Sequence, residues 1–152
     1  YLIIVFLVFF TLIMPPLYQK TLNVGLEPNW PLDTFRGASN WLQNNTPPRS
    51  IVFHSDWDEW PALFYNNTHN YYIIGLDPTF MENFNPKLHK LYRDITQGSI
   101  RNNIANLIKT NFGADYVFIE KAGHQQFMDN LYVDKNADKV YEDNTTIIYK
   151  LK

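Results

Sequence analysis

The first seventeen residues constrain the fold of this chain more than any other stretch. Residues 1–17 read YLIIVFLVFFTLIMPPL, carry no charge, and include only one clearly polar side chain, that of Thr11. A signal peptide would need a basic start and a cleavage site of small residues, and a helix buried in a soluble protein is seldom apolar on all sides. We therefore expect residues 1–18 to form a transmembrane helix, the end of a longer membrane region, which Pro15 and Pro16 terminate.

The rest of the chain divides into a linker and a soluble domain. Residues 19–32 contain glycine and prolines without any periodicity, which is typical of a linker, and Lys20 alone is too little charge to fix an orientation in the membrane. Residues 33–152 are numerous enough to bury a hydrophobic core. The net charge of −2 offers no basic surface for nucleic acid, and the absence of cysteine excludes disulfides and thiolate sites.

Short β-rich runs alternate with helical patterns throughout residues 33–152. The predicted strands are 50–54, 71–74, 115–120, 139–142 and 146–149. The predicted helices follow a cap at Asp33 or Thr34, then Pro61, the Asn85-Pro86 pair, Ser99 and Gln125. This alternation predicts an α/β fold: a Rossmann-like, mostly parallel sheet with helices on both faces and a C-terminal antiparallel hairpin. The expected interior includes Trp41, Ile51, Phe53, Ile73, Leu91, Ile104, Val117, Ile119 and Ile148.

Acidic and aromatic residues follow the first predicted strand directly, in the run SDWDEW. Ligands of open α/β sheets gather beyond the carboxyl ends of the strands, and Asp77 follows the next strand. We therefore predict substrate contacts at Asp56, Trp57, Asp58 and Asp77. Carboxylates accept hydrogen bonds from hydroxyl or amide groups, and a tryptophan ring offers a flat apolar face to a sugar or lipid-linked group.

Several other interpretations of the same residues compete with substrate binding. His54, Asp56 and Asp58 would share one face of an extended chain and could hold a divalent metal, but the aspartates could equally cap the next helix and His54 could be structural. The neighbouring Asp58 and Glu59 point in different directions, unlike the paired carboxylates of glycosidases, and Asp77 fits a simple Asp-Pro turn.

We expect neither a catalytic residue nor a metal or other cofactor in this chain. It contains no GxGxxG motif after the first strand, no P-loop and no GxSxG motif. The three remaining histidines stand alone in the sequence and are expected at the surface: His69, His89 and His124.

Two stretches together resemble a known family. Residues 38–47 read ASNWLQNNTP and precede a strand that enters SDWDE at residues 55–59. This layout resembles the C-terminal extracytoplasmic part of GT-C-type integral-membrane glycosyltransferases, including the oligosaccharyltransferase catalytic subunit, where a Trp-Trp-Asp-Tyr-Gly loop contacts the acceptor. Trp57 and Asp58 correspond to the second Trp and the Asp of that loop. Asp56, Glu59 and Trp60 depart from it, which indicates a bacterial relative with another acceptor.

The resemblance implies a function that sequence chemistry alone does not supply. It implies an accessory, substrate-side domain of a membrane glycosyltransferase, with catalysis performed by an upstream part, so that this fragment alone is not expected to be active. It also implies a cell-membrane location, an extracytoplasmic domain, and a lipid-linked sugar or an acceptor as partner. The alternative is a membrane-tethered binding or interaction domain without catalysis. Nucleic acid is not an expected partner.

Overall fold

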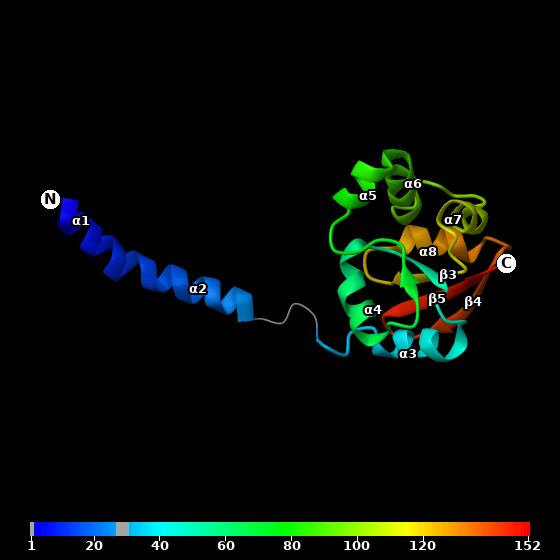
Figure 1. Ribbon diagram of the computed structural model, residues 1–152, viewed down its shortest axis with the longest axis horizontal. Coiled ribbons are helices and arrows are strands. Elements are labelled where there is room, and N and C mark those ends of the chain that lie inside the picture. The colour runs from blue at the N-terminus through cyan, green and yellow to red at the C-terminus, as the bar shows by residue number, and fades with distance from the viewer. Residues whose placement is uncertain (1, 27–30) are drawn as a thin grey trace. The chain divides into compact units, whose positions relative to one another are not determined.

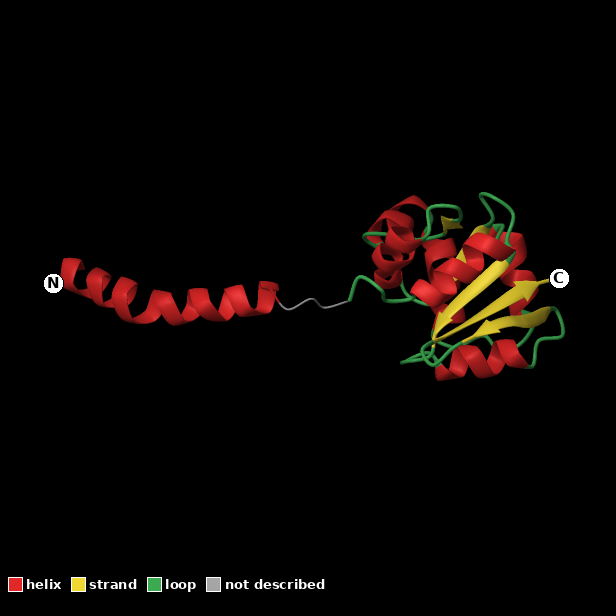
Figure 2. Cartoon of the chain, turned by 90° about the horizontal axis from the view of Figure 1, so that it is seen from below, coloured by secondary structure: helices red, strands yellow, loops and turns green. Residues whose placement is uncertain are grey.

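The computed structural model describes residues 2–26 and 31–152, which belong to two separate units (Figure 1). The units comprise Tyr1–Leu32 and Asp33–Lys152. The first is helical and the second is a mixed α/β domain built on an open sheet (Figure 2).

The N-terminal unit is helical well beyond the two prolines. It consists of α1 (Leu2–Val8), the π-helical segment η1 (Phe9–Ile13) and α2 (Met14–Leu26). Pro15 and Pro16 directly follow η1 and lie inside a helix that continues to Leu26, so they do not end it. The linker predicted over residues 19–32 is therefore wrong for residues 19–26. Good helix formers there, including Gln19, Lys20 and Leu22, outweigh the single glycine. Residues 27–30 lie outside the described part of the chain.

Every side chain described between residues 3 and 22 is exposed. The large apolar ones are Ile3, Phe6, Leu7, Val8, Phe9, Phe10, Leu12, Ile13, Met14, Leu17, Tyr18 and Leu22. Within residues 2–26 and 31–152, no helix combines the length and the apolar character needed to cross a membrane. The transmembrane helix predicted over residues 1–18 stays a prediction.

The α/β domain contains a five-stranded sheet in the order β2-β1-β3-β5-β4. Its strands are β1 (Ile51–His54), β2 (Tyr71–Tyr72), β3 (Tyr116–Glu120), β4 (Ala137–Glu142) and β5 (Thr146–Leu151). β1 runs parallel to both β2 and β3, whereas β5 is antiparallel to β3 and to β4. The predicted C-terminal hairpin is thus confirmed, and it is attached to the parallel strands through β5.

Helices cover both faces of the sheet. They are α3 (Arg36–Asn45), the 3-10 helix η2 (Trp57–Glu59), α4 (Trp60–Asn66), α5 (Thr79–Phe84), α6 (Pro86–Thr96), α7 (Ile104–Phe112) and α8 (Gln125–Tyr132). α6, α7 and α8 lie on one face, and α3 and α4 lie on the other (Figure 1). Strand residues alternate between the two: Phe53 and Val117 join the core under α6–α8, and Phe118 meets Phe35 on the opposite face, with 4.9 Å between ring centroids.

Most of the predicted interior is correct. Five of its members are buried: Phe53, Ile104, Val117, Ile119 and Ile148. The other four are only half-buried: Trp41, Ile51, Ile73 and Leu91. Three of these four still pack against the core under α6–α8, namely Ile51, Ile73 and Leu91.

The predicted element boundaries fail where the chain takes a left-handed backbone conformation. α3 follows Phe35, at φ +60°, and neither Asp33 nor Thr34 is its cap residue. α7 begins at Ile104 after Asn103, at φ +57°, and not at Ser99. Helix α5 was not predicted, and β2 pairs over two residues only, so Ile73 and Ile74 belong to the loop that follows it.

Candidate functional site

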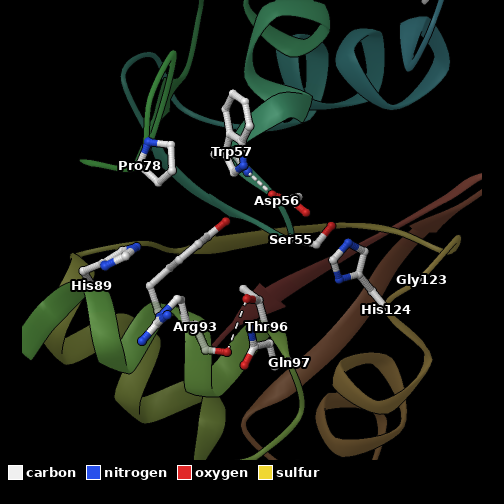
Figure 3. Close-up of a pocket in the computed structure, with 11 residues that line it drawn as sticks. Ser55, Asp56, Trp57, Pro78, His89, Arg93, Thr96, Gln97, Gly123 and His124 are labelled. Atoms are coloured by element: carbon white, nitrogen blue, oxygen red, sulfur yellow. Dashed lines mark hydrogen bonds between the residues drawn. The ribbon is translucent and has the colours of Figure 1, made fainter. Parts of the chain in front are cut away.

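A cleft of about 420 Å³ lies beyond the carboxyl ends of β1 and β3. The chain passes from β1 to β2 on one side, and β3 then pairs with β1 on the other side. Crevices at such a reversal of strand order are where open α/β sheets bind ligands. The cleft is lined by the turn after β1, the loop after β3, and α6 (Figure 3): Ser55, Asp56, Trp57, Pro78, His89, Tyr92, Arg93, Thr96, Gln97, Gly123 and His124.

A capping box shapes the wall that follows β1. The carboxylate of Asp56 accepts a hydrogen bond from the Trp57 N–H, 2.7 Å away, and also caps the backbone of Glu59. In return, Glu59 Oε2 accepts a hydrogen bond from the Asp56 N–H at 3.0 Å. These reciprocal bonds fold residues 57–59 into η2, so the capping role proposed for Asp56 is confirmed.

A buried polar network lies beneath this turn. Glu59, His54 and Ser55 have almost no exposed surface. The hydroxyl of Ser55 donates to Glu59 Oε1 and accepts from the Glu120 N–H at 2.9 Å, so it links the ends of β1 and β3. Tyr92 reaches the same place from α6, and its hydroxyl donates to the backbone oxygen of His54 at 3.2 Å.

His54 is held by backbone oxygens on both sides of its ring. Nδ1 lies 2.6 Å from the Asp56 carbonyl oxygen, and Nε2 lies 2.7 Å from that of Ile74. Glu59 Oε2 also lies near the ring, 3.3 Å from Nδ1.

The structure contradicts the metal site considered for His54, Asp56 and Asp58. That arrangement required an extended chain, but the chain turns into η2 at Asp56, and both nitrogens of His54 are engaged by backbone. Within residues 2–26 and 31–152, no group of three or more histidine, aspartate or glutamate side chains is placed to hold a metal ion.

Carboxylates gather around this edge of the sheet and influence one another. Burial raises the pKa of Asp58, and the neighbouring charges of Asp56 and Glu59 raise it further. Burial also raises the pKa of Glu120, and the charge of Glu59 adds to the effect. His124 partly offsets both shifts. Of these carboxylates, Asp56 lines the cleft, as does His124, whereas Asp58, Glu59 and Glu120 lie near it without lining it.

Only two of the four predicted contact residues line the cleft. Asp56 and Trp57 do, and the Trp57 side chain, 40% exposed, stands at the rim with its ring directed away from Arg93 in Figure 3. Asp58 is exposed on the same turn without lining the cleft. Asp77 does not join them: its Oδ1 accepts from the Thr79 N–H at 2.8 Å, and the residue borders a different hollow. Because β2 ends at Tyr72, Asp77 lies in a loop and not at the end of a strand.

α6 and its C-cap residue Gln97 contribute further cleft residues that sequence reasoning missed. His89, Arg93, Thr96 and Gln97 follow one another at i, i+4, i+7 and i+8, which places them on one stripe of the helix beside its apolar face. This stripe of polar residues beside the apolar face was the sequence signal from which these cleft residues could have been predicted. His89 was expected at the surface, but it is buried.

The remaining histidines differ in their surroundings. His124 is half-buried and lines the cleft directly before α8. His69 is also half-buried, and its Nε2 lies 2.9 Å from the carbonyl oxygen of Thr46, outside the cleft. Among the described residues, the guanidinium of Arg93 forms no ion pair within 4 Å, so the cleft holds a cation available to a ligand.

In comparisons with known proteins, no family model matches the chain and no curated protein gives a match.

Proposed function

We propose that the α/β domain binds a hydroxyl-rich substrate, such as the sugar part of a donor or acceptor, in the cleft beyond β1 and β3. The position of the cleft at the reversal of strand order is the observation that carries the proposal. Asp56 supplies acceptors on one wall, and Arg93 and Gln97 supply donors on the other. Trp57 offers an aromatic surface at the rim for the less polar part of the ligand.

The role we assign to the domain is binding, with chemistry performed elsewhere in the protein. The hydroxyl nearest the centre of the turn is already committed to structure, because Ser55 donates to the buried Glu59. The same carboxylate stabilises the turn, so Ser55 acts as a structural link between strands. This structural role of Ser55 supports an accessory, substrate-side domain.

We place this domain in a membrane glycosyltransferase-like protein, on the extracytoplasmic side of the cell membrane. The resemblance of residues 38–47 and 55–59 to the GT-C-type enzymes supports this, as does a Rossmann-like arrangement of β2, β1 and β3. The exposed apolar side chains of residues 3–22 support an association of the N-terminal unit with the membrane.

A second candidate is a membrane-tethered interaction domain without any link to catalysis. The observation that favours it is the exposure of three large apolar side chains at and just before α5, none of which lines the cleft: Leu76, Phe80 and Phe84. The two candidates differ in the sequence expected before Tyr1: many further membrane spans with an acidic first loop support the glycosyltransferase, and a single span supports the interaction domain.

Sugar binding by the full chain in detergent tests the proposed site. Arg93→Ala and Trp57→Ala should each weaken binding of a responsive sugar about tenfold, equivalent to about 1.4 kcal/mol of lost interaction. Isothermal titration calorimetry with a panel of neutral and phosphorylated sugars measures this. Arg36→Ala, an exposed arginine on α3, is the matched control and should bind like the parent. Unchanged binding by Arg93→Ala, or no binding of any sugar, would contradict the proposal.

The proposed location has a separate test. A reporter that is active only in the cytoplasm, fused after Lys152, should be silent in cells, and one that is active only outside the cytoplasm should work. The reverse result would exclude the extracytoplasmic side without affecting the sugar-binding measurement.

A further inference from the structure

We propose that a second hollow, between α8 and the hairpin of β4 and β5, binds a neutral sugar or a similar compound with several hydroxyl groups. Its lining includes Asp129 and Tyr132 from α8, Lys139 and Glu142 from β4, and Tyr149 from β5, and we call it the hairpin hollow. Its volume of about 320 Å³ falls within the range of about 300–1,000 Å³ that small-molecule sites occupy. It shares no lining residue with the cleft beyond β1 and β3.

The hydroxyl of Tyr149 is a polar group that the protein itself leaves unpartnered. Tyr149 is only 2% exposed and belongs to the core under α6–α8, yet within residues 2–26 and 31–152 its hydroxyl forms no hydrogen bond. In the same part of the chain, Ser39 Oγ alone is both unpartnered and sealed from solvent. The Tyr149 hydroxyl therefore keeps a small exposed area, and the hairpin hollow is the space that Tyr149 lines. Since buried polar groups are almost always hydrogen-bonded, this hydroxyl is placed to bond a ligand.

The Tyr149 hydroxyl keeps its proton at neutral pH. Burial raises the pKa of Tyr149, and the neighbouring groups of Glu142, Tyr132 and Asp129 raise it further. The hydroxyl is thus a hydrogen-bond donor to any acceptor in the hollow. The carboxylates that act on it would also repel an anion placed beside it.

The charged side chains around the hollow balance one another. Lys121 and Lys139 lie 2.8 Å and 2.5 Å from the two carboxylate oxygens of Glu142, and Asp129 accepts a hydrogen bond from Gln125 at 2.7 Å. Two lysines and two carboxylates leave no net charge to attract an ion. An ammonium group has three donors and each carboxylate oxygen has two lone pairs, so both kinds of group can still bond the hydroxyls of a neutral ligand.

An apolar surface completes the hairpin hollow. Met128 and Ile147 are each 8% exposed and contribute aliphatic lining, whereas Tyr132 is 71% exposed at the end of α8. Met128 and Tyr132 share one face of the helix because they are four residues apart. A sugar ring combines an apolar face of C–H groups with a hydroxyl-bearing edge, which suits a hollow with an aromatic ring and unused donors and acceptors.

Sugar titration of the full chain tests the proposal, in a detergent without a sugar headgroup. The probes are the methyl glycosides of glucose, galactose, mannose and N-acetylglucosamine, and saturation-transfer NMR measures the dissociation constant. The background carries Arg93→Ala and Trp57→Ala, which weaken the cleft. In it, Tyr149→Phe should weaken binding of a responsive glycoside about fivefold, as expected for the loss of one hydrogen bond, and Tyr132→Ala should weaken it by a similar factor. Tyr65→Phe, which alters an exposed tyrosine of α4, is the matched control and should leave the dissociation constant unchanged.

The melting temperature separates a ligand site from a structural role. Because the Tyr149 hydroxyl has no partner among the described residues, Tyr149→Phe should melt like its parent. A lower melting temperature with unchanged glycoside binding means that the hydroxyl holds only a structural water, and it overturns the proposal. Glycoside binding that disappears in the Arg93→Ala, Trp57→Ala background also overturns it and leaves the cleft as the sugar site. Binding that survives there and falls with Tyr149→Phe establishes the hairpin hollow independently of the cleft.

Discussion

At the scale of single residues, His54 shows how neighbours decide a role that a sequence leaves open. As a histidine next to two aspartates it fits a metal ligand, yet its ring nitrogens face the carbonyl oxygens of Asp56 and Ile74. The ring therefore ties the end of β1 to the loop after β2. Since the second of these oxygens is twenty residues away, no local pattern reveals it.

Glu59 should be the most sensitive residue of the same network. Removing its carboxylate leaves the Ser55 hydroxyl and the Asp56 N–H without an acceptor in a buried place, and takes away the group that lies 3.3 Å from His54 Nδ1. We expect Glu59→Ala to lower the free energy of unfolding by about 3–5 kcal/mol, the usual cost of breaking a buried pair from one side. Urea unfolding followed by tryptophan fluorescence measures it.

An exposed glutamate provides the comparison. Glu82→Ala in α5 should change the free energy of unfolding by no more than about 0.5 kcal/mol. If Glu59→Ala were as mild as this control, the hydrogen bonds assigned to Glu59 would not be formed in solution.

At the scale of elements, the sequence predicted the start of a helix correctly where the residues that cap it are its direct neighbours in the chain. Asn85 caps α6 as predicted, with its side chain accepting from the Leu88 N–H at 3.1 Å, and α8 begins at the predicted Gln125. α7 was placed too early because its first turn is capped from afar: the Ala105 N–H donates to Asp134 Oδ2, 3.0 Å away. A partner 29 residues further along the chain leaves no mark in the local sequence.

The glycine that follows α6 should tolerate alanine poorly. Gly98 has φ +73°, and an added Cβ would lie 2.5 Å from Gln126 and 3.1 Å from its backbone. Gly113, at φ +66° after α7, meets only Ile51 at 3.6 Å. Both alanine variants carry the left-handed penalty of about 1 kcal/mol or more, but Gly98→Ala should cost about 1–3 kcal/mol beyond Gly113→Ala because of crowding. Equal losses in urea unfolding would mean that Gln126 moves aside freely.

The turn between β4 and β5 should make the domain sensitive to acid. Partial burial opposes ionisation of Asp143, but hydrogen bonds from Thr145, Tyr141 and Thr146 lower its pKa to about 2. A carboxyl group with a lowered pKa stabilises the folded state above its unfolded value, 3.8, and loses this effect as the pH falls toward about 2. Asp143→Asn should therefore lower the free energy of unfolding near neutral pH. It should also make that free energy fall less steeply as the pH drops from 3.8 toward about 2.

Melting temperatures recorded across that acid range provide the measurement. Asn144→Ala changes an exposed residue of the same turn without altering a charge, so it should retain the parent's slope. An Asp143→Asn variant with an undiminished slope would show that other carboxylates cause the acid sensitivity.

At the scale of the whole molecule, the alternation of strand and helix was enough to predict a mixed α/β domain with its terminal hairpin. The site was predicted less completely. The turn after β1 was found because it directly follows a strand, whereas Arg93 reaches the cleft from α6 and His124 from the loop before α8, and no periodicity in the sequence specifies how these two parts pack. Asp77 was misplaced because the two-residue β2 is shorter than its apolar sequence suggests.

The domain should fold without the N-terminal unit. Asp33–Lys152 forms a separate unit with its own core, so a protein limited to these residues should unfold in one cooperative transition on heating. Differential scanning calorimetry tests this, with the full chain in detergent as the comparison. A broad, non-cooperative melt of the shorter protein would show that the N-terminal unit contributes to the fold.

The position of β5 has a consequence for how the protein is made. Of the five strands in this sheet, β5 comes last along the chain, yet it lies between β3 and β4. On the ribosome, β4 emerges first and has no neighbour to join until residues 146–151 have left the exit tunnel. The nascent domain therefore cannot complete its sheet during most of its synthesis. A premature stop codon before Thr146 would release an incompletely folded chain that quality-control proteases degrade.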